Sequence, residues 1–313
     1  MKISGFSMAK NADKLGYPVK ETVLSILPLV DEFIIAIGDC DPYDKTRELI
    51  AGIEGDKIRI IDTVWDLDKY PRGMEHAHQT DIAKEQCSGD WLFYLQADEI
   101  VHEKDHPVIR QRCEEFLNDE NVEGLLFNYI HFWGDYYHYH HSHSWYKNEI
   151  RIIKNDPEIH SWESAQSFRR IPVFDGLNYR VKKNTYKLKV ARVDADIYHY
   201  GWVRPPHIMT NKAIVFSTIH HGKERAEELH EKNDIEFDYG DLTKLPVFKR
   251  THPKVMEQRI KEFDWAEKLS QPARKRPRLK HEKSKYKFLT FLEKKVFKRT
   301  LFGFKNYILV TGK

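Results

Sequence analysis

Glu32-Phe33-Ile34-Ile35-Ala36-Ile37 is a nearly continuous apolar run. A strand inside a parallel sheet is covered on both faces, and its sequence then reads as such a run rather than as an alternation. Outward from this segment, apolar runs alternate with helix-periodic stretches over the first hundred residues. The pattern predicts strands at 2–6, 32–37, 58–61 and 91–95, and helices at 18–29, 45–53 and 75–87. This order predicts an α/β fold with a mostly parallel, Rossmann-like sheet flanked by helices.

The composition favours a folded, soluble protein. Of the 313 residues, 41% are hydrophobic and 32% are charged, so a large core can form and general disorder is not expected. Three cysteines without a CxxC pair argue against a disulfide framework or a zinc ribbon, and they suit a reducing compartment. No apolar run reaches the roughly 20 residues of a membrane span, and residues 1–7 are too polar for a signal peptide. We therefore expect a cytoplasmic protein.

The sequence patterns divide the chain into three parts. After residue 120, aromatic strands are expected at 124–133, 149–153 and 196–200, joined by loops rich in His, Tyr and Trp. This predicts that residues 121–270 form an α+β half that closes over the α/β half of residues 1–120. The remainder, 271–313, begins at a Pro- and Arg-rich linker and forms a tail.

Carboxylates follow two of the expected strands. Asp98 and Glu99 come shortly after strand 91–95, and Asp39 follows strand 32–37. Because ligands of such sheets bind beyond the carboxyl ends of the strands, these residues are candidates for a site. Hard oxygen ligands there suit Mg²⁺ or Mn²⁺ on a diphosphate. The alternatives are that Asp98 and Glu99 cap a following helix, and that Asp39 only forms a turn.

Together these segments resemble the nucleotide-sugar half of a GT-A glycosyltransferase of family 2. The matching residues are Asn11 before the first helix, Asp39 through Thr46, and Gly89 through Glu99. The resemblance covers residues 1–105 and, more loosely, 120–204. It implies a GT-A fold with a nucleotide-sugar-binding half (1–120) and an acceptor-binding half (121–270). The implied activity is transfer of a sugar from a nucleotide-sugar to a glycan, lipid-linked or other hydroxyl acceptor, by metal-assisted, inverting displacement.

The resemblance also implies roles for individual residues. The residues implied to form the Mn²⁺ or Mg²⁺ site are Asp98, Glu99 and His199. Asp98 would be the direct ligand, Glu99 would support it from behind or cap a helix, and His199 could equally be a structural histidine. The residues implied to bind the donor nucleotide are Gly5, Phe6, Ser7, Asp39, Arg72, Gln96 and Arg204. One of them departs from the family, because Gln96 stands where the first Asp of a D-x-D element is usual. A neutral amide can bond a ribose hydroxyl, but it weakens the case for tight metal binding.

The second half is expected to supply the catalytic base and the acceptor site. Segment 160–166 resembles the one where inverting members of the family carry the catalytic carboxylate, which makes Glu163 the candidate base, against a plain surface Glu, with Asp175 in reserve. In the His-rich run 136–145, His140 and His143 are candidate acceptor contacts, as is Trp162. The same run could instead be a structural loop or a metal site, although catalytic zinc usually draws its ligands from separate elements.

The tail carries its own prediction. Residues 272–313 hold 14 Lys and Arg against two acidic residues, so the body is acidic and the tail basic. Residues 283–304 predict a basic amphipathic helix, which is typical of a surface that lies on anionic lipid. The expected location is therefore cytoplasmic, with peripheral attachment to the inner face of the membrane. Nucleic-acid binding and simple packing on the body are the alternatives, and we expect no nucleic-acid partner.

Two other functions are alternatives for a chain with these patterns. A sugar nucleotidyltransferase shares the architecture, but it normally has a Gly-rich loop after the first strand, and residues 7–11 contain no glycine. A degenerate relative that binds a nucleotide or a glycan without turnover is the non-enzymatic alternative, and Gln96 is the residue that favours it.

Overall fold

The parallel sheet predicted for the first half is present in the computed structural model, which describes residues 1–230, 236–269, 278–298, 300–301 and 305–310. Four strands pair in parallel in the order β3-β2-β1-β4. Their bounds are β1 Ile3–Ala9, β2 Glu32–Ile37, β3 Ile58–Asp62 and β4 Trp91–Tyr94. The α/β prediction is therefore confirmed, and strand β1 is longer at its carboxyl end than expected.

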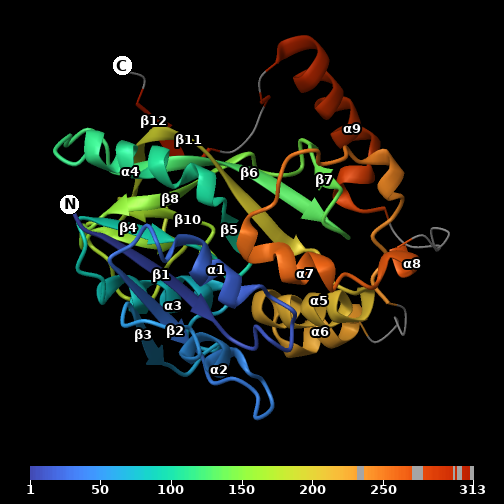
Figure 1. Cartoon of the computed structure of the whole chain (residues 1–313), viewed down its shortest axis with the longest axis horizontal. Helices are drawn as coiled ribbons and strands as arrows, with labels where there is room; N and C mark the ends of the chain where they lie inside the picture. The colour runs from blue at the N-terminus through green and yellow to red at the C-terminus, as the bar shows by residue number, and fades with distance from the viewer. Residues whose placement is uncertain (231–235, 270–277, 299, 302–304, 311–313) are drawn as a thin grey trace.

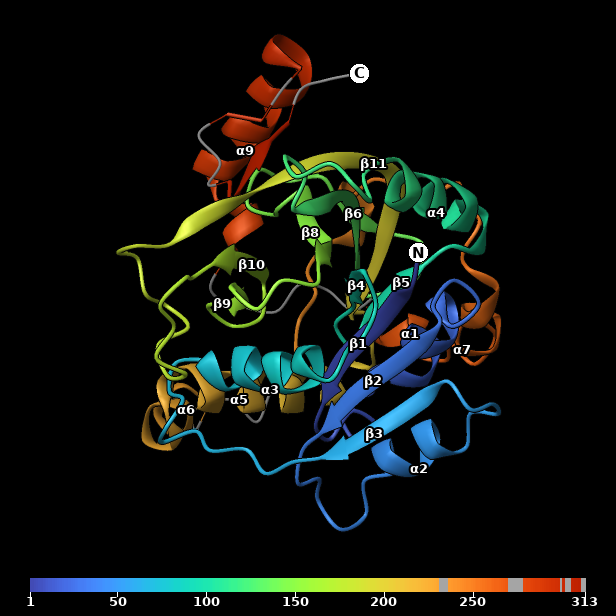
Figure 2. The same cartoon turned by 90° about the vertical axis from the view of Figure 1, so that its left-hand side faces the viewer.

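Helices cover both faces of this sheet (Figure 2). They are α1 (Val19–Ile26), α2 (Thr46–Ala51) and α3 (Met74–Glu85). Alternate residues of β2 face two different cores. Phe33 and Ile35 pack in a cluster that includes residues of α1 and α2, whereas Ile34 packs in a cluster with α3 residues. This two-sided burial is the reason why the sequence of β2 is apolar throughout.

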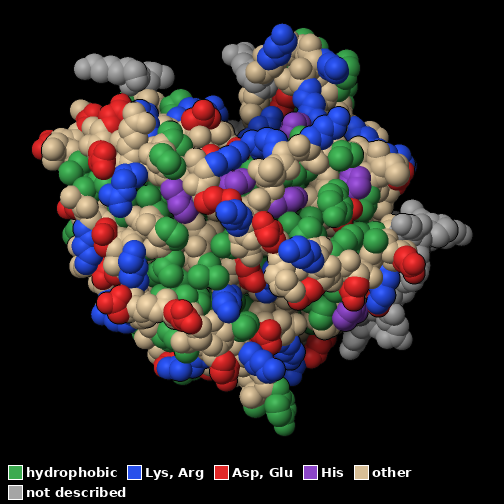
Figure 3. Space-filling view, viewed as in Figure 1, with side chains coloured by type: hydrophobic (Ala, Val, Ile, Leu, Met, Phe, Trp, Pro, Cys, Tyr) green, Lys and Arg blue, Asp and Glu red, His purple; other side chains and the backbone are tan. Residues whose placement is uncertain are grey.

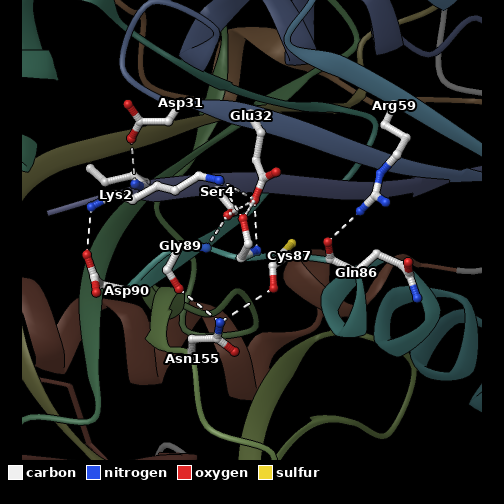
Figure 4. Close-up of polar contacts among 12 residues, drawn as sticks. Lys2, Ser4, Asp31, Glu32, Arg59, Gln86, Cys87, Gly89, Asp90 and Asn155 are labelled. Carbon is white, nitrogen blue, oxygen red and sulfur yellow. Dashed lines mark hydrogen bonds and ion pairs between the residues drawn. The ribbon is translucent and has the colours of Figure 1, made fainter.

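Polar contacts tie the amino ends of β1, β2 and β4 together (Figure 4). Glu32 accepts hydrogen bonds from the hydroxyl of Ser4 at 2.6 Å and from the backbone N–H and hydroxyl of Ser88, each at 2.8 Å. The backbone N–H of Lys2 donates to Asp90 at 2.7 Å, and the Asn155 amide donates to the carbonyl of Gly89 at 2.9 Å. These bonds fix the edge of the sheet opposite the strand ends at which a ligand is expected.

The second half continues the same sheet through β8, β6 and β11, in that order from β4. Strand β8 runs antiparallel to both β4 and β6, and β6 runs parallel to β11. The elements of this half are β5 (Glu99–Val101), η1 (Glu103–Asp105), α4 (His106–Glu115), β6 (Gly124–Trp133), β7 (Tyr139–His140), β8 (Asn148–Lys154), β9 (Ile159–Trp162), β10 (Ser167–Arg170) and β11 (Tyr186–Trp202). The predicted strands at 124–133, 149–153 and 196–200 are thus confirmed, although β11 begins ten residues earlier than expected.

Strand β5 corrects one reading of the carboxylate motif. Glu99 begins this short strand, and the first helical turn starts only at Glu103. The reading of Asp98 and Glu99 as caps of a following helix is therefore wrong. Because β5 pairs antiparallel with β11, Glu99 lies opposite His199 in the register. The pairing brings the two predicted metal-binding segments side by side.

Beyond β11 the chain is mainly helical. The elements are α5 (Pro206–His221), α6 (Lys223–His230), η2 (Leu242–Lys244), η3 (Lys254–Met256), α7 (Glu257–Lys261) and α8 (Ala266–Leu269). The backbone N–H of Gly73, just before α3, donates to the carbonyl of Ile219 at 3.1 Å. Helix α5 is thereby joined to the first half of the chain.

The tail is only partly the helix that the sequence predicts. Its described elements are η4 (Lys280–Glu282), α9 (Ser284–Phe291), a wide helical turn η5 (Leu292–Phe297) and strand β12 (Tyr307–Leu309). The helical stretch ends at Phe297, where Lys298 follows in a left-handed conformation with φ 49°, and β12 pairs in parallel with β11. Residues 299 and 302–304 of the predicted helix lie outside the described residues. The predicted linker at 272–277 lies outside the described residues. Helix α9 stands out from the body in both views (Figures 1 and 2).

Two further features of the described residues bear on the sequence predictions. The three cysteines are free thiols. Among the helices that the structure describes, none combines the length and the apolar composition needed to cross a bilayer.

Candidate functional site

A cavity of about 700 Å³ opens beyond the carboxyl ends of β1 and β4. Its wall comes from the segment after β1, from the segment after β4, from the end of β11 and from α5. Its polar and aromatic lining residues include Lys10, Asn11, Tyr17, Trp65, Gln96, Asp98, Tyr146, Ser164, His199, Trp202 and Lys212. A volume of this size is typical of small-molecule and cofactor sites.

Asp98 is the acidic centre of this cavity. It is 5% exposed, with the Nζ atom of Lys212 3.3 Å from its Oδ2 and the Nε2 atom of His199 3.7 Å from its Oδ1. Burial alone would raise its pKa, but the charges of Lys212 and Arg204 outweigh burial and lower the pKa of Asp98 to about 2. Asp98 is thus a carboxylate at any physiological pH.

The tautomer of His199 follows from its neighbour His131. The two Nδ1 atoms are 2.9 Å apart, and the Nε2 atom of His131 lies 2.8 Å from the carbonyl oxygen of Tyr146. Since a carbonyl only accepts, His131 must donate through Nε2 and accept at Nδ1, so His199 donates through Nδ1. Burial, as the largest cause, lowers the pKa of both imidazoles. The Nε2 lone pair of neutral His199 is therefore left facing Asp98.

The space between these two groups depends on Gly201. A Cβ atom on Gly201 would lie 2.6 Å from the Nε2 atom of His199 and 2.7 Å from the Oδ2 atom of Asp98. A carboxylate oxygen and an imidazole lone pair that face each other across an open space fit a cation. Asp98 and His199 would supply two protein ligands, which suits Mg²⁺ because it commonly takes only one or two from the protein, with phosphate oxygens and water completing its shell.

The other predicted metal ligand, Glu99, does not face this space. Its two carboxylate oxygens accept from Nε and Nη2 of Arg151, at 2.6 and 2.7 Å, and the hydroxyl of Tyr129 donates to it at 2.8 Å. Gln96 does line the cavity, and its amide donates to the carbonyl of Ala165 at 3.0 Å. Within the described part of the chain, no three His, Cys, Asp or Glu side chains are grouped so that they could hold a metal by themselves.

The residues predicted to bind the nucleotide divide into two groups. Asp39 lies at the rim, where it bonds the Lys10 ammonium at 2.7 Å and the backbone N–H of Trp65 at 2.9 Å, and both of these residues line the cavity. Arg72 is exposed, and its carbonyl accepts from Arg180. Asp98 and His199 thus line one cavity, whereas Asp39 adjoins it through Lys10 and Trp65 and is not itself part of the wall.

The expectation for the end of the first strand needs a correction. Gly5, Phe6 and Ser7 are inside strand β1 and fully enclosed, because β1 pairs with β2 as far as Ala9. A Cβ on Gly5 would lie 2.5 Å from the ring of Phe33, so its role is close packing. The residues that reach the cavity are the next five, 8–12.

The predicted base residues lie outside the cavity wall. Glu163 has φ 57° and immediately precedes Ser164, which lines the cavity. Asp175 is in an exposed turn, where it accepts from the backbone N–H groups of Leu177 and Asn178. The residues on either side of Asp175 line a separate cavity of about 410 Å³.

The predicted acceptor contacts all have structural partners. His140 is stacked on Trp145, with ring centroids 4.7 Å apart. The Nδ1 atom of His143 lies 2.7 Å from a carboxylate oxygen of Glu293 in the tail. Trp162 is buried under the guanidinium of Arg169. None of these three predicted residues is part of the cavity wall described above.

Two cations lie near the cavity, and the sequence predicted one of them, Arg204, but not the other, Lys212. Lys212 comes from α5, and no motif in its sequence marked it. Burial, as the largest cause, and the charge of Arg204 lower the pKa of Lys212 to about 7, while Asp98 opposes this shift. Arg204 was predicted, and its guanidinium lies over the ring of Tyr17.

Among the comparisons with known proteins, only the comparison with solved structures finds similar proteins. A scan against protein-family models gives no match, and a search of curated proteins gives none either. One similar structure is S. aureus TarS, with 13% identity and TM-score 0.39 over 75% of this chain and 41% of that chain. Another is glucosyl-3-phosphoglycerate synthase from Mycobacterium tuberculosis in complex with Mn²⁺, uridine diphosphate and phosphoglyceric acid, with 20% identity and TM-score 0.28 over 41% and 43% of the two chains. The match thus covers less than half of the TarS and the synthase chains.

Proposed function

We propose that this protein transfers a sugar from a nucleotide-sugar to a hydroxyl acceptor. The observation that carries the proposal is the meeting of Asp98 and His199, 3.7 Å apart, in a cavity at the carboxyl ends of a parallel sheet. Asp98 and His199 come from motifs that are far apart in the sequence. Only the resemblance to family 2 glycosyltransferases predicted that the two motifs share one site. Ligands of open α/β sheets bind at this edge.

The nucleoside part of the donor is proposed to lie between the end of β1 and residues 39–65. Asp39 accepts a hydrogen bond from the base, which takes the place of the bond from Lys10. The indole of Trp65 lines the same side of the cavity, and its buried Nε1 atom has no partner among the described residues. Gln96 is proposed to bond a ribose hydroxyl, which a neutral amide can do both as donor and as acceptor.

Asp98 and His199 are the residues proposed to hold Mn²⁺ or Mg²⁺, through the space that Gly201 leaves open. When bound there, the ion supplies positive charge to the leaving diphosphate. His131 keeps the Nε2 lone pair of His199 turned toward that space. Glu99 is not among the proposed ligands, since Arg151 binds both of its oxygens.

The proposed reaction is an inverting displacement at the anomeric carbon. The acceptor oxygen forms a bond to that carbon, while the bond to the diphosphate oxygen breaks and its electron pair stays on the diphosphate. The hydroxyl proton goes to a carboxylate base. Glu163 is proposed as this base because it adjoins the cavity-lining Ser164, and Asp175 is the reserve.

A lipid-linked or membrane-bound acceptor is proposed from the tail. Helix α9 exposes Phe288 and Phe291 among lysines, and Lys and Arg side chains show on this projection (Figure 3). Glu293, in the following turn η5, joins the tail to Lys147 and His143 at 2.8 and 2.7 Å. Because Tyr146 of the same loop lines the cavity, a tail lying on anionic lipid would hold the cavity near the membrane surface.

The test is turnover of a panel of UDP-, GDP-, CMP- and dTDP-sugars with Mn²⁺ or Mg²⁺, with Asp98→Ala and the exposed Asp56→Ala as matched variants. We expect one nucleotide class to be hydrolysed or transferred, a loss of at least 100-fold in Asp98→Ala, and no change in Asp56→Ala. Full activity in Asp98→Ala would overturn the proposal. Nucleotide or glycan binding without any turnover would identify the non-catalytic relative instead.

A further inference from the structure

Lys212 places a positive charge inside the cavity from a helix outside the motifs discussed so far. Its Nζ atom lies 3.3 Å from the Oδ2 atom of Asp98 and 2.7 Å from the carbonyl oxygen of Gly201. The same atom lies 4.5 Å from the ring centroid of Tyr17 and 5.9 Å from that of Trp202. An ammonium group has three N–H donors, and these two oxygens account for two of them.

Arg204 is a second cation close to the first, and it adjoins the cavity through Tyr17 without being part of the wall itself. It is 1% exposed, and its guanidinium carbon lies 4.6 Å from the ring centroid of Tyr17. Among the described residues, none of its three side-chain nitrogens has a hydrogen-bond partner. A buried guanidinium without partners is costly. This cost indicates that an anion completes the site.

The charges around the cavity favour an anion even before a metal ion is added. Position 96 is a neutral glutamine, and Glu99 is neutralised by Arg151. Asp98 is therefore the negative group that faces both Lys212 and Arg204, and it balances one of the two. A site with two free carboxylates would repel a diphosphate until a divalent ion was bound.

We infer that Lys212 and Arg204 bind the diphosphate of the donor without needing a divalent ion. The identity of the ligand as a nucleotide-sugar diphosphate rests on the proposed function. The third N–H of Lys212 and the fork of Arg204 are the donors to the phosphate oxygens. When the bond between sugar and diphosphate breaks, the electron pair left on the diphosphate is stabilised by these two cations. A metal ion at Asp98 and His199 then adds to a site that already holds the anion.

The test uses inorganic pyrophosphate as the probe, in the presence of EDTA, with the full chain and isothermal titration calorimetry. We expect wild-type protein to bind pyrophosphate and Lys212→Ala to bind at least tenfold more weakly, while Lys212→Arg stays within about threefold of the wild type. Lys223→Ala, which removes one charge from the neighbouring helix α6, should bind as the wild type does. If Lys212→Ala does not fold, as judged by circular dichroism, Lys212→Met keeps most of the packing volume and replaces it.

A variant of Asp98 is expected to change the affinity for pyrophosphate in the opposite direction from Lys212→Ala. Asp98→Asn removes the negative charge that faces both cations, so pyrophosphate should bind in EDTA at least as tightly as in the wild type. If pyrophosphate binding instead requires a metal held by Asp98, wild-type protein binds pyrophosphate only when Mn²⁺ replaces EDTA, and Asp98→Asn loses that binding. Absence of binding in EDTA to folded wild-type protein, or unchanged binding in Lys212→Ala, would overturn the inference.

These outcomes are separate from those of the proposed function. Metal-dependent turnover of a nucleotide-sugar, together with no pyrophosphate binding in EDTA, would remove the inference and leave the transferase. Pyrophosphate binding in EDTA that depends on Lys212, without turnover of any donor, would remove the transferase and leave the anion site.

Discussion

Both carboxylate oxygens of Glu99 are bound by Arg151, through Nε at 2.6 Å and Nη2 at 2.7 Å, and both side chains are fully buried. Glu99 belongs to the sequence motif that most resembles a metal-binding element, yet it serves the packing between β5 and β8. The backbone N–H of Gln96 also donates to Glu99, at 3.1 Å. The pair therefore fixes the loop that carries Asp98 into the cavity.

The first prediction concerns the stability of this pair. Arg151→Met leaves the buried carboxylate of Glu99 without its partner, and we expect a loss of about 3–5 kcal/mol in the free energy of unfolding. Glu99→Gln combined with Arg151→Met should recover a large part of that loss. Urea denaturation followed by tryptophan fluorescence measures both. The exposed pair of Arg47 and Asp62 is the matched control, and Arg47→Met should unfold as the wild type does. Equal stability of Arg151→Met and wild type would contradict this prediction.

The second prediction concerns the space between Asp98 and His199. Gly201→Ala places a Cβ 2.6 Å from the Nε2 atom of His199, so it would fill the proposed cation position. We expect at least a tenfold loss of Mn²⁺ affinity, measured by electron paramagnetic resonance of free Mn²⁺. Gly176→Ala is the control, since its Cβ would meet nothing within 4 Å. Its φ of 73° is unfavourable for alanine, so we expect Gly176→Ala to lose a little stability but no Mn²⁺ affinity. Undiminished Mn²⁺ binding in folded Gly201→Ala would place the ion elsewhere.

The sheet and the position of Asp98 follow from local sequence patterns, whereas the end of β1 does not. The parallel sheet was predictable because β2 is apolar on both faces, and Asp98 because carboxyl ends of parallel strands meet at one edge. The sequence predicts that the first strand ends at residue 6, whereas β1 continues to Ala9. Strand propensity does not show how far a strand stays paired with its neighbour. The sequence therefore pointed to Gly5 through Ser7 rather than to Lys10 and Asn11.

Lys212 could not be predicted by the same reasoning. It lies in α5, and its place beside Asp98 depends on how that helix packs across the cavity, which no local pattern encodes.

The His-rich run 136–145 was instead predicted as a ligand site that the structure does not place in the cavity wall. Its residues suggested a ligand site, but His140 stacks on Trp145 and His143 bonds Glu293 of the tail, a partner 150 residues away. Long-range contacts of this kind are absent from periodicity and composition.

The third prediction concerns acid stability through Glu32. Burial alone would raise its pKa, but hydrogen bonds from Ser4 and Ser88 and the charge of Lys2 lower the pKa from 4.5 to about 2. Because the folded-state pKa is the lower one, the stabilisation is complete above pH 4.5 and is lost as the pH falls toward 2. We expect Glu32→Gln to cost about 2 kcal/mol at pH 7 and to differ little from the wild type near pH 2. Denaturant unfolding at a series of pH values measures this difference, with the exposed Glu54→Gln as control. A difference that does not shrink at low pH would show that the carboxylate charge is not the cause.

The last prediction concerns the tail as a membrane-binding surface. Phe288 and Phe291 are 61% and 55% exposed on α9, and Lys287 lies exposed beside them. Apolar groups that enter the lipid interface and lysines that meet anionic headgroups act together there. We expect the protein to sediment with vesicles of phosphatidylcholine and phosphatidylglycerol and not with phosphatidylcholine alone.

Two variants separate the apolar and electrostatic contributions. The double variant Phe288→Ser and Phe291→Ser, and the charge reversal Lys285→Glu with Lys287→Glu, should each weaken vesicle binding about tenfold or more. Lys45→Glu with Lys223→Glu changes the net charge by the same amount on exposed positions of other elements, and it should bind as the wild type does. Equal weakening by that control would mean that binding follows net charge rather than α9. Binding to single-stranded DNA at physiological salt, with none to vesicles, would favour the nucleic-acid alternative for the tail.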